Sequence, residues 1–107
     1  MTQSLPDAFA SSLAGDGPPP AWPTPLAALW WLARDPGGPG TEAWERAHAT
    51  VQDASGAEAA WVHAHLHRIE GDAGNARYWY GRAGRAEARG PLAVERAALI
   101  AALWAAV

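Results

Sequence analysis

Glycine and proline divide this 107-residue chain into short segments, which limits it to short elements of secondary structure. The strongest break is the run DPGGPG at residues 35–40, and further breaks follow at Gly71, at Gly84 and at Gly90-Pro91. Between the breaks, apolar residues recur with helical spacing, and no segment has the alternation typical of a strand. The sequence therefore predicts an all-α fold of about five short antiparallel helices.

Capping residues set the expected limits of these helices. Thr24, Thr41 and Asp72 are predicted N-caps, and Ser55 with Glu58 has the spacing of a capping box, S-x-x-E. The predicted helices cover residues 24–33, 41–51, 55–70, 72–83 and 92–106.

Residues 1–22 differ from the rest of the chain. Gly15, Gly17 and the proline run at 18–20 block regular structure and favour an extended segment. We expect a flexible Pro/Gly-rich N-terminal arm here, followed by a single all-α domain at residues 23–107. In the alternative arrangement, Phe9 and Trp22 attach the arm to the core.

The middle of the chain carries a helical-repeat pattern. Ala76 and Tyr80 have the Ala-x3-aromatic spacing of the second half of a tetratricopeptide repeat. Residues 24–83 therefore resemble about two tetratricopeptide (TPR) or Sel1-like hairpins. The resemblance implies two TPR-like helical hairpins plus a closing C-terminal helix. The chain departs from the repeat at His63 and His67, where leucine and tyrosine are usual.

The same region also resembles a family of small uncharacterised bacterial proteins, through the runs WVHAHLHR at residues 61–68 and NARYWY at 75–80. This second resemblance implies a fold and no mechanism. Function therefore has to be inferred from the side chains.

One polar cluster is expected inside the hairpins. His63, His67 and Glu70 are spaced i, i+4 and i+7 on one helix, and His48 on the preceding helix can face them. Three imidazoles and a carboxylate can hold a divalent metal such as zinc. They can also act in the metal-free acid–base chemistry of a small enzyme, or form a structural hydrogen-bond network. All three alternatives remain open at this point.

A second set of residues predicts a contact surface. Trp61, His65 and Arg68 share another stripe of the same helix, and Arg82 belongs to a basic edge that follows. Tryptophan and arginine are enriched at binding hot spots. We expect a small TPR-like module that needs no cofactor and uses these residues to bind a peptide, a partner protein or a small acidic ligand. In the alternative, the arm or the last helix covers Trp61.

Composition excludes several kinds of site and partner. The absence of cysteine excludes disulfides and cysteine-based metal sites, and a net charge of −3 disfavours nucleic acid as a partner. No apolar run reaches the ~18–20 residues that span a bilayer, and the N-terminus does not begin like a secretory signal. We therefore expect a cytoplasmic bacterial protein without a membrane partner. The apolar face of the last helix also predicts a homodimer, through Leu99, Leu103 and Trp104.

Overall fold

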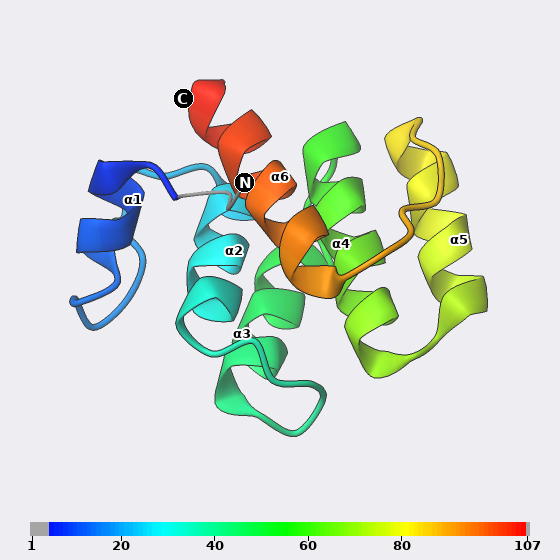
Figure 1. Ribbon diagram of the computed structural model, residues 1–107, viewed down its shortest axis with the longest axis horizontal. Coiled ribbons are helices and arrows are strands. Elements are labelled where there is room, and N and C mark those ends of the chain that lie inside the picture. Colours follow the sequence, from blue (N-terminus) through cyan, green and yellow to red (C-terminus); the bar gives the residue numbers. More distant parts are fainter. Residues whose placement is uncertain (1–4, 107) are drawn as a thin grey trace.

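In the computed structural model, which describes residues 5–106, every regular element is a helix (Figure 1). The helices are α1 (Asp7–Ser12), α2 (Thr24–Arg34), α3 (Glu42–Val51), α4 (Ala57–Glu70), α5 (Ala73–Ala83) and α6 (Leu92–Ala105). The predicted all-α class is confirmed. The last five elements are the five predicted helices, to within two residues at each end.

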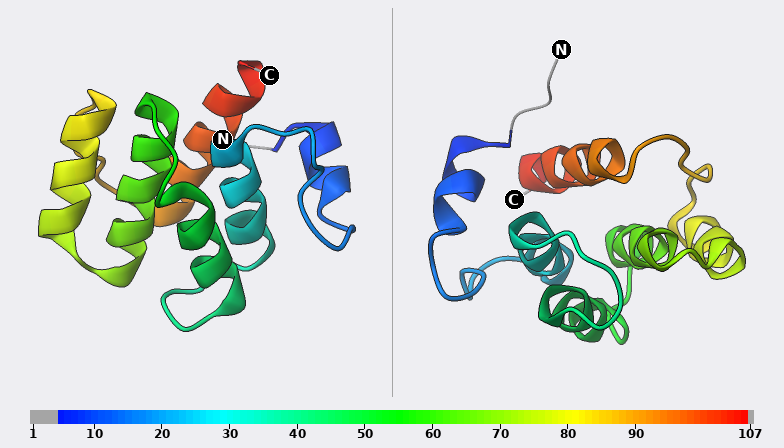
Figure 2. Two further views of the ribbon diagram at one scale, coloured as in Figure 1. Left: turned by 180° about the vertical axis from the view of Figure 1, so that it is seen from behind. Right: turned by 60° about the horizontal axis from the view of Figure 1, so that its bottom comes forward.

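The helices form two hairpins and one crossing helix. α2 packs along α3 and α4 packs along α5, while α3 also contacts α4, so these four helices form a row. α6 crosses the row and packs against both α2 and α4 (Figure 1, Figure 2). α1 lies at the edge of the molecule opposite α5. Helix α4 consequently has neighbours on several sides.

The core is built around α4. Its residues 61–67 are all buried, because α3, α5 and α6 pack against different sides of this one helix. Val62 and Leu66 join Leu29 of α2 and Leu99 of α6 in a single apolar cluster. Three histidines belong to the same buried run. Because buried ring nitrogens need partners, the surroundings of α4 are where polar chemistry is concentrated.

Two of the predicted N-caps are confirmed. The Thr41 hydroxyl accepts a hydrogen bond from the backbone N–H of Trp44 at 3.2 Å, and the Asp72 carboxylate accepts one from the backbone N–H of Asn75 at 3.1 Å. Gly71, with φ of 84°, ends α4 in the left-handed conformation that glycine adopts at least cost. The turn between α4 and α5 is therefore determined by adjacent residues.

The other two caps were predicted wrongly. Thr24 is not an N-cap, since α2 begins at this residue, directly after Pro23. The capping box at Ser55 does not form, because Gly56, with φ of 105°, is the N-cap residue of α4. The helix therefore begins one residue later than the capping box requires, and no side chain caps it.

This difference between caps gives a direct prediction. Thr41→Ala should lower the free energy of unfolding by about 1 kcal/mol, because it removes two hydrogen bonds of the hydroxyl. One is the cap bond accepted from Trp44, and the other is donated to the Gly38 carbonyl at 2.8 Å. Ser55→Ala is the matched control and should change stability by less than about 0.5 kcal/mol. Urea unfolding followed by circular dichroism measures both. Equal losses would contradict the placement of the start of α4.

The N-terminal segment contains an element that the sequence analysis did not predict. Instead of extended chain, residues 7–12 form helix α1, and Phe9 is fully buried. Its ring stacks on Trp22 at a centroid distance of 5.3 Å and meets the edge of Trp104 at 6.2 Å. Phe9 and Trp22 thus attach the segment to α6, as in the alternative arrangement.

The apolar face of α6 is used inside the chain. Leu99 and Leu103 are buried, and Trp104 packs edge-to-face on Trp22 at 5.5 Å. The homodimer predicted through this face therefore loses its basis, since the same residues already have partners in the monomer. α4 and α6 have 14 residues each. Within residues 5–106, no helix has the length and apolar character needed to cross a bilayer.

Candidate functional site

Three histidines from two helices converge beside α4. His48 lies on α3, and His63 and His67 lie one turn apart on α4. One donor nitrogen from each ring lies within 4.8 Å of the other two. His63 and His67 are buried and His48 is half-buried. The structure therefore brings together the three imidazoles that the sequence selected, and we call them the His48–His63–His67 cluster.

Two tryptophans hold the rings of this cluster. The indole of Trp79 lies on His63 at a centroid distance of 3.9 Å and an interplanar angle of 10°. The indole of Trp44 lies on His48 at 5.0 Å and 8°. Trp44 is itself fixed, because its Nε1–H donates to the Leu66 carbonyl at 3.1 Å. Such stacking restricts the ring orientations while leaving the nitrogens at the ring edges free to bind.

The predicted carboxylate partner is also present. Glu70 hydrogen-bonds with Nδ1 of His67, one turn away on α4. The nitrogen of His67 left for another ligand is therefore Nε2. Asp72 extends the arrangement toward solvent, since His67, Glu70 and Asp72 form a second group with donor atoms within 4.8 Å of one another. Glu70 thus orients a cluster histidine from outside the cluster.

His63 has an unusual electrostatic environment. Burial lowers the pKa of His63 to about 4, with further lowering from the charges of His67 and His48. The ring is consequently neutral at pH 7, which is the state that binds metals. Its Nδ1 is buried and has no hydrogen-bond partner within residues 5–106. An unpartnered buried polar atom costs about 1–3 kcal/mol, so this nitrogen needs an explanation.

A second polar group, which the sequence analysis missed, is centred on Glu95 of α6. Its carboxylate accepts hydrogen bonds from Trp61 Nε1 at 3.2 Å and from Arg68 at 2.9 Å, and also from the hydroxyl of Tyr80. Nδ1 of His65 lies 2.7 Å from the same carboxylate. We call this set the Glu95 network; it ties α4, α5 and α6 together.

The network keeps Glu95 ionised. Burial acts to raise its pKa, but hydrogen bonds from His65, Tyr80 and Arg68 outweigh burial and lower the pKa of Glu95 to about 2. Burial and the adjacent carboxylate raise the pKa of Tyr80, so its hydroxyl remains a donor. The sequence contains one signal that could have revealed this network: Glu95 is an acidic residue on the apolar stripe of α6, four positions before Leu99.

The predicted contact residues do not form one exposed surface. Trp61 and His65 are only 8% and 0% exposed, because α6 covers them and Glu95 binds them. The prediction that they line an open concave face is therefore wrong, and the alternative of cover by the last helix is correct. Arg68 also belongs to the Glu95 network, because it donates a hydrogen bond to Glu95. Arg82 lies apart, on α5, where it donates to the Tyr78 hydroxyl at 3.0 Å.

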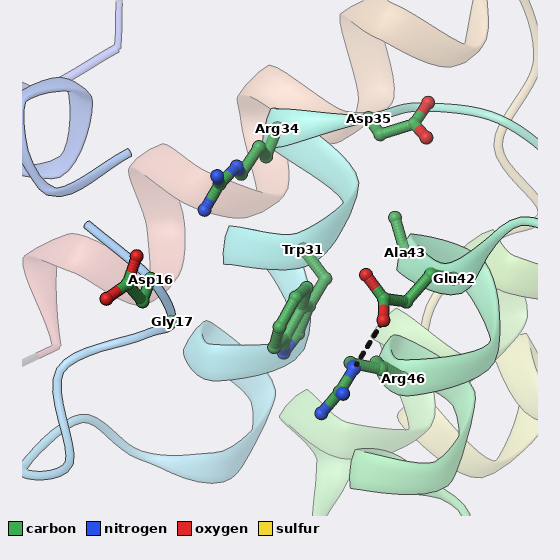
Figure 3. A pocket seen from close by; sticks show the side chains of 8 residues that line it. All are labelled: Asp16, Gly17, Trp31, Arg34, Asp35, Glu42, Ala43 and Arg46. Carbon is green, nitrogen blue, oxygen red and sulfur yellow. Dashed lines mark ion pairs between the residues drawn. The ribbon is translucent and has the colours of Figure 1, made fainter. Parts of the chain in front are cut away.

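A cavity lined mainly by residues of α2 and α3 is separate from both groups. It has a volume of about 840 Å³ and lies between α2, α3 and residues 16–17 (Figure 3). Figure 3 shows Trp31 between Arg34 and Arg46. Arg46 lies over the Trp31 ring at 4.9 Å and pairs with Glu42 at 3.5 Å. Since its charged groups largely engage one another or the backbone, this cavity offers weaker evidence of a ligand than the cluster does.

A scan against protein-family models and searches of curated proteins and of solved structures found no match for the chain. The chain forms two hairpins and a closing helix, and its resemblance to tetratricopeptide repeats stays a prediction. Function is therefore inferred from the geometry of the described side chains.

Proposed function

We propose that the protein binds a divalent transition-metal ion, of which zinc is the prime example, through His48, His63 and His67. One observation carries the proposal: three imidazoles from two helices present donor nitrogens within 4.8 Å of one another, and the buried Nδ1 of His63 has no hydrogen-bond partner within residues 5–106. Three histidines are an established zinc ligand set in proteins, with the fourth position left for water or another ligand.

The protonation state of His63 supports metal binding. A metal ligand must be deprotonated, and protons compete with the metal for each ring. The low pKa of His63, about 4, removes this competition at the His63 ring at neutral pH. A bound metal would give the crowded ring nitrogens a common partner.

The distances also fit a metal after small adjustments. Zinc–nitrogen bonds of about 2.0–2.1 Å in a tetrahedral site place the ligand nitrogens about 3.4 Å apart. The cluster nitrogens lie within 4.8 Å, so modest side-chain rotation closes the site. His48 has the freedom for such a rotation, because it is only half-buried.

Glu70 has the position of an orienting carboxylate. Metal-binding histidines usually donate their second ring N–H to a carboxylate or carbonyl group, which fixes the tautomer. The hydrogen bond between Glu70 and Nδ1 of His67 has this form and leaves Nε2 for the ion. The peptide-binding alternative has weaker support, because Trp61, His65 and Arg68 serve the Glu95 network instead of an open face.

Titration calorimetry with zinc chloride tests the proposal on protein stripped with EDTA and desalted. We expect one equivalent of zinc per chain. Glu70→Gln should weaken binding about 10–100-fold, because it removes the charge that orients His67. Glu58→Gln is the matched control, since Glu58 is an exposed carboxylate at the start of the same helix. Its affinity should equal that of the wild type.

Two results would contradict the proposal. Absence of saturable zinc binding would exclude the metal site and leave structural or metal-free acid–base roles for the histidines. Equal losses in Glu70→Gln and Glu58→Gln would show that zinc binds to general negative charge and not to the cluster.

A further inference from the structure

A groove beside Trp61 is separate from the metal cluster. It has a volume of about 490 Å³ and is bordered by the connection between α5 and α6 on one side and by α6 on the other. Its walls include Trp61, Arg85, Arg89, Val94 and Ala98. A second cavity of about 330 Å³ shares Trp61, Gly84 and Arg85 with the first. Volumes of this size are typical of small-ligand sites.

The floor of the groove is rigid. Trp61 donates its Nε1–H to Glu95, which fixes the orientation of the ring. The guanidinium of Arg85 lies over this ring, 3.4 Å from its centroid. The backbone of Arg85 is also held, because its N–H donates to the Tyr80 carbonyl at 3.0 Å after the left-handed Gly84. A fixed indole therefore carries a flat cation on its face.

The free charge in the groove is positive. Within residues 5–106, neither Arg85 nor Arg89 forms an ion pair with a carboxylate, whereas Arg77 pairs with Glu87 at 3.1 Å. Glu95 also lines the groove, but its two oxygens are occupied by the four partners of its network. An incoming anion consequently meets two unpaired guanidinium groups and no free carboxylate from Glu95.

We propose that this groove binds an organic anion that carries a carboxylate on a planar apolar body. The carboxylate pairs with Arg85 and Arg89, whose planar guanidinium groups suit bidentate contacts with it. The apolar body packs on Val94 and Ala98, next to the stacked Trp61 and Arg85. Val94 is 52% exposed, so covering it removes apolar surface from water. This site is independent of the proposed metal function.

The test uses 2-naphthoate and follows the seven tryptophan indole N–H signals by ¹⁵N-resolved NMR. We expect saturable shifts that are largest for Trp61. The neutral 2-naphthamide and inorganic phosphate each lack one half of the recognition, so each should bind at least about tenfold more weakly. If naphthamide bound with the same affinity as naphthoate, the groove would not recognise the charge. If phosphate bound with the same affinity as naphthoate, the groove would not recognise the apolar body. Either result would overturn the proposal. Zinc-free protein should bind naphthoate as tightly as zinc-treated protein.

Matched variants locate the site. Arg85→Gln and Arg89→Gln remove charge from exposed side chains, and each should weaken naphthoate binding at least about tenfold. Arg46→Gln is the control, because Arg46 also lies over a tryptophan, Trp31, but in the cavity at α2 and α3. Its affinity should be unchanged. The proposal would be overturned if Arg85→Gln and Arg89→Gln changed the naphthoate affinity no more than Arg46→Gln does. It would also be overturned if the largest shifts occurred at an indole other than that of Trp61.

Discussion

Glu95→Gln should lower the free energy of unfolding by about 3–5 kcal/mol, the usual result of removing one member of a buried charged group. Arg68 would lose its counter-ion. The hydrogen-bond donors of Trp61 and Tyr80 would face an amide that has only one acceptor oxygen and brings an NH₂ group among other donors. Denaturant unfolding of the purified variant measures the loss.

An exposed ion pair supplies the control. Glu87→Gln breaks the pair with Arg77, whose side chain is 68% exposed, and should cost less than about 1 kcal/mol. A loss for Glu95→Gln that is no larger than this would contradict the view that the network joins α4, α5 and α6.

The loss for Glu95→Gln should also depend on pH with a defined sign. The folded protein lowers the pKa of Glu95 from 4.5 to about 2, so the unfolded chain takes up the proton first as pH falls. The stabilisation is complete above pH 4.5 and disappears as pH falls from 4.5 toward 2, by about 3 kcal/mol in total. The difference between wild type and Glu95→Gln should shrink over this window. A constant difference would be inconsistent with an ionised Glu95.

Zinc should raise the stability of the wild-type protein strongly. A ligand present at 100 times its dissociation constant adds about 2.7 kcal/mol when it binds only the folded state. For a domain of this size that corresponds to a rise in Tm of roughly 10–20 °C. His63→Phe should abolish most of this rise, because the phenyl ring can still stack on Trp79 but has no donor nitrogen. Thermal unfolding with and without zinc measures the effect.

The metal-free form of the same variant separates metal binding from a structural role. The Nδ1 of His63 has no hydrogen-bond partner in the described residues, so its removal should leave zinc-free stability equal or higher. A loss of more than about 1 kcal/mol in the absence of zinc would show that the imidazole itself holds the core together.

The positions of the helices could be predicted because their ends depend on adjacent residues. Thr41, Gly71 and Asp72 act within one turn of the chain, and each was identified correctly. Helix α1 could not be found in this way. Its six residues depend on the insertion of Phe9 against Trp104, a contact between opposite ends of the sequence. The start of α4 was misplaced by one residue because glycine can replace a polar cap.

The His48–His63–His67 cluster and the Glu95 network differ in whether their contacts are local in the sequence. His63, His67 and Glu70 are related by helical periodicity within α4, so their proximity follows from the sequence. Glu95 meets partners that lie 15 to 34 positions away, which only the crossing of α6 brings together. The same crossing covers Trp61, and a local pattern does not specify whether a hairpin face stays open.

The ring nitrogens themselves provide the most direct test of the metal site. Long-range ¹H–¹⁵N NMR reports the four imidazoles separately, and His65 is an internal control because it belongs to the Glu95 network. With one equivalent of zinc, the donor nitrogens of His48, His63 and His67 should move together to metal-bound shifts while those of His65 stay in place. Unchanged spectra, or shifts confined to a single exposed ring, would contradict the account.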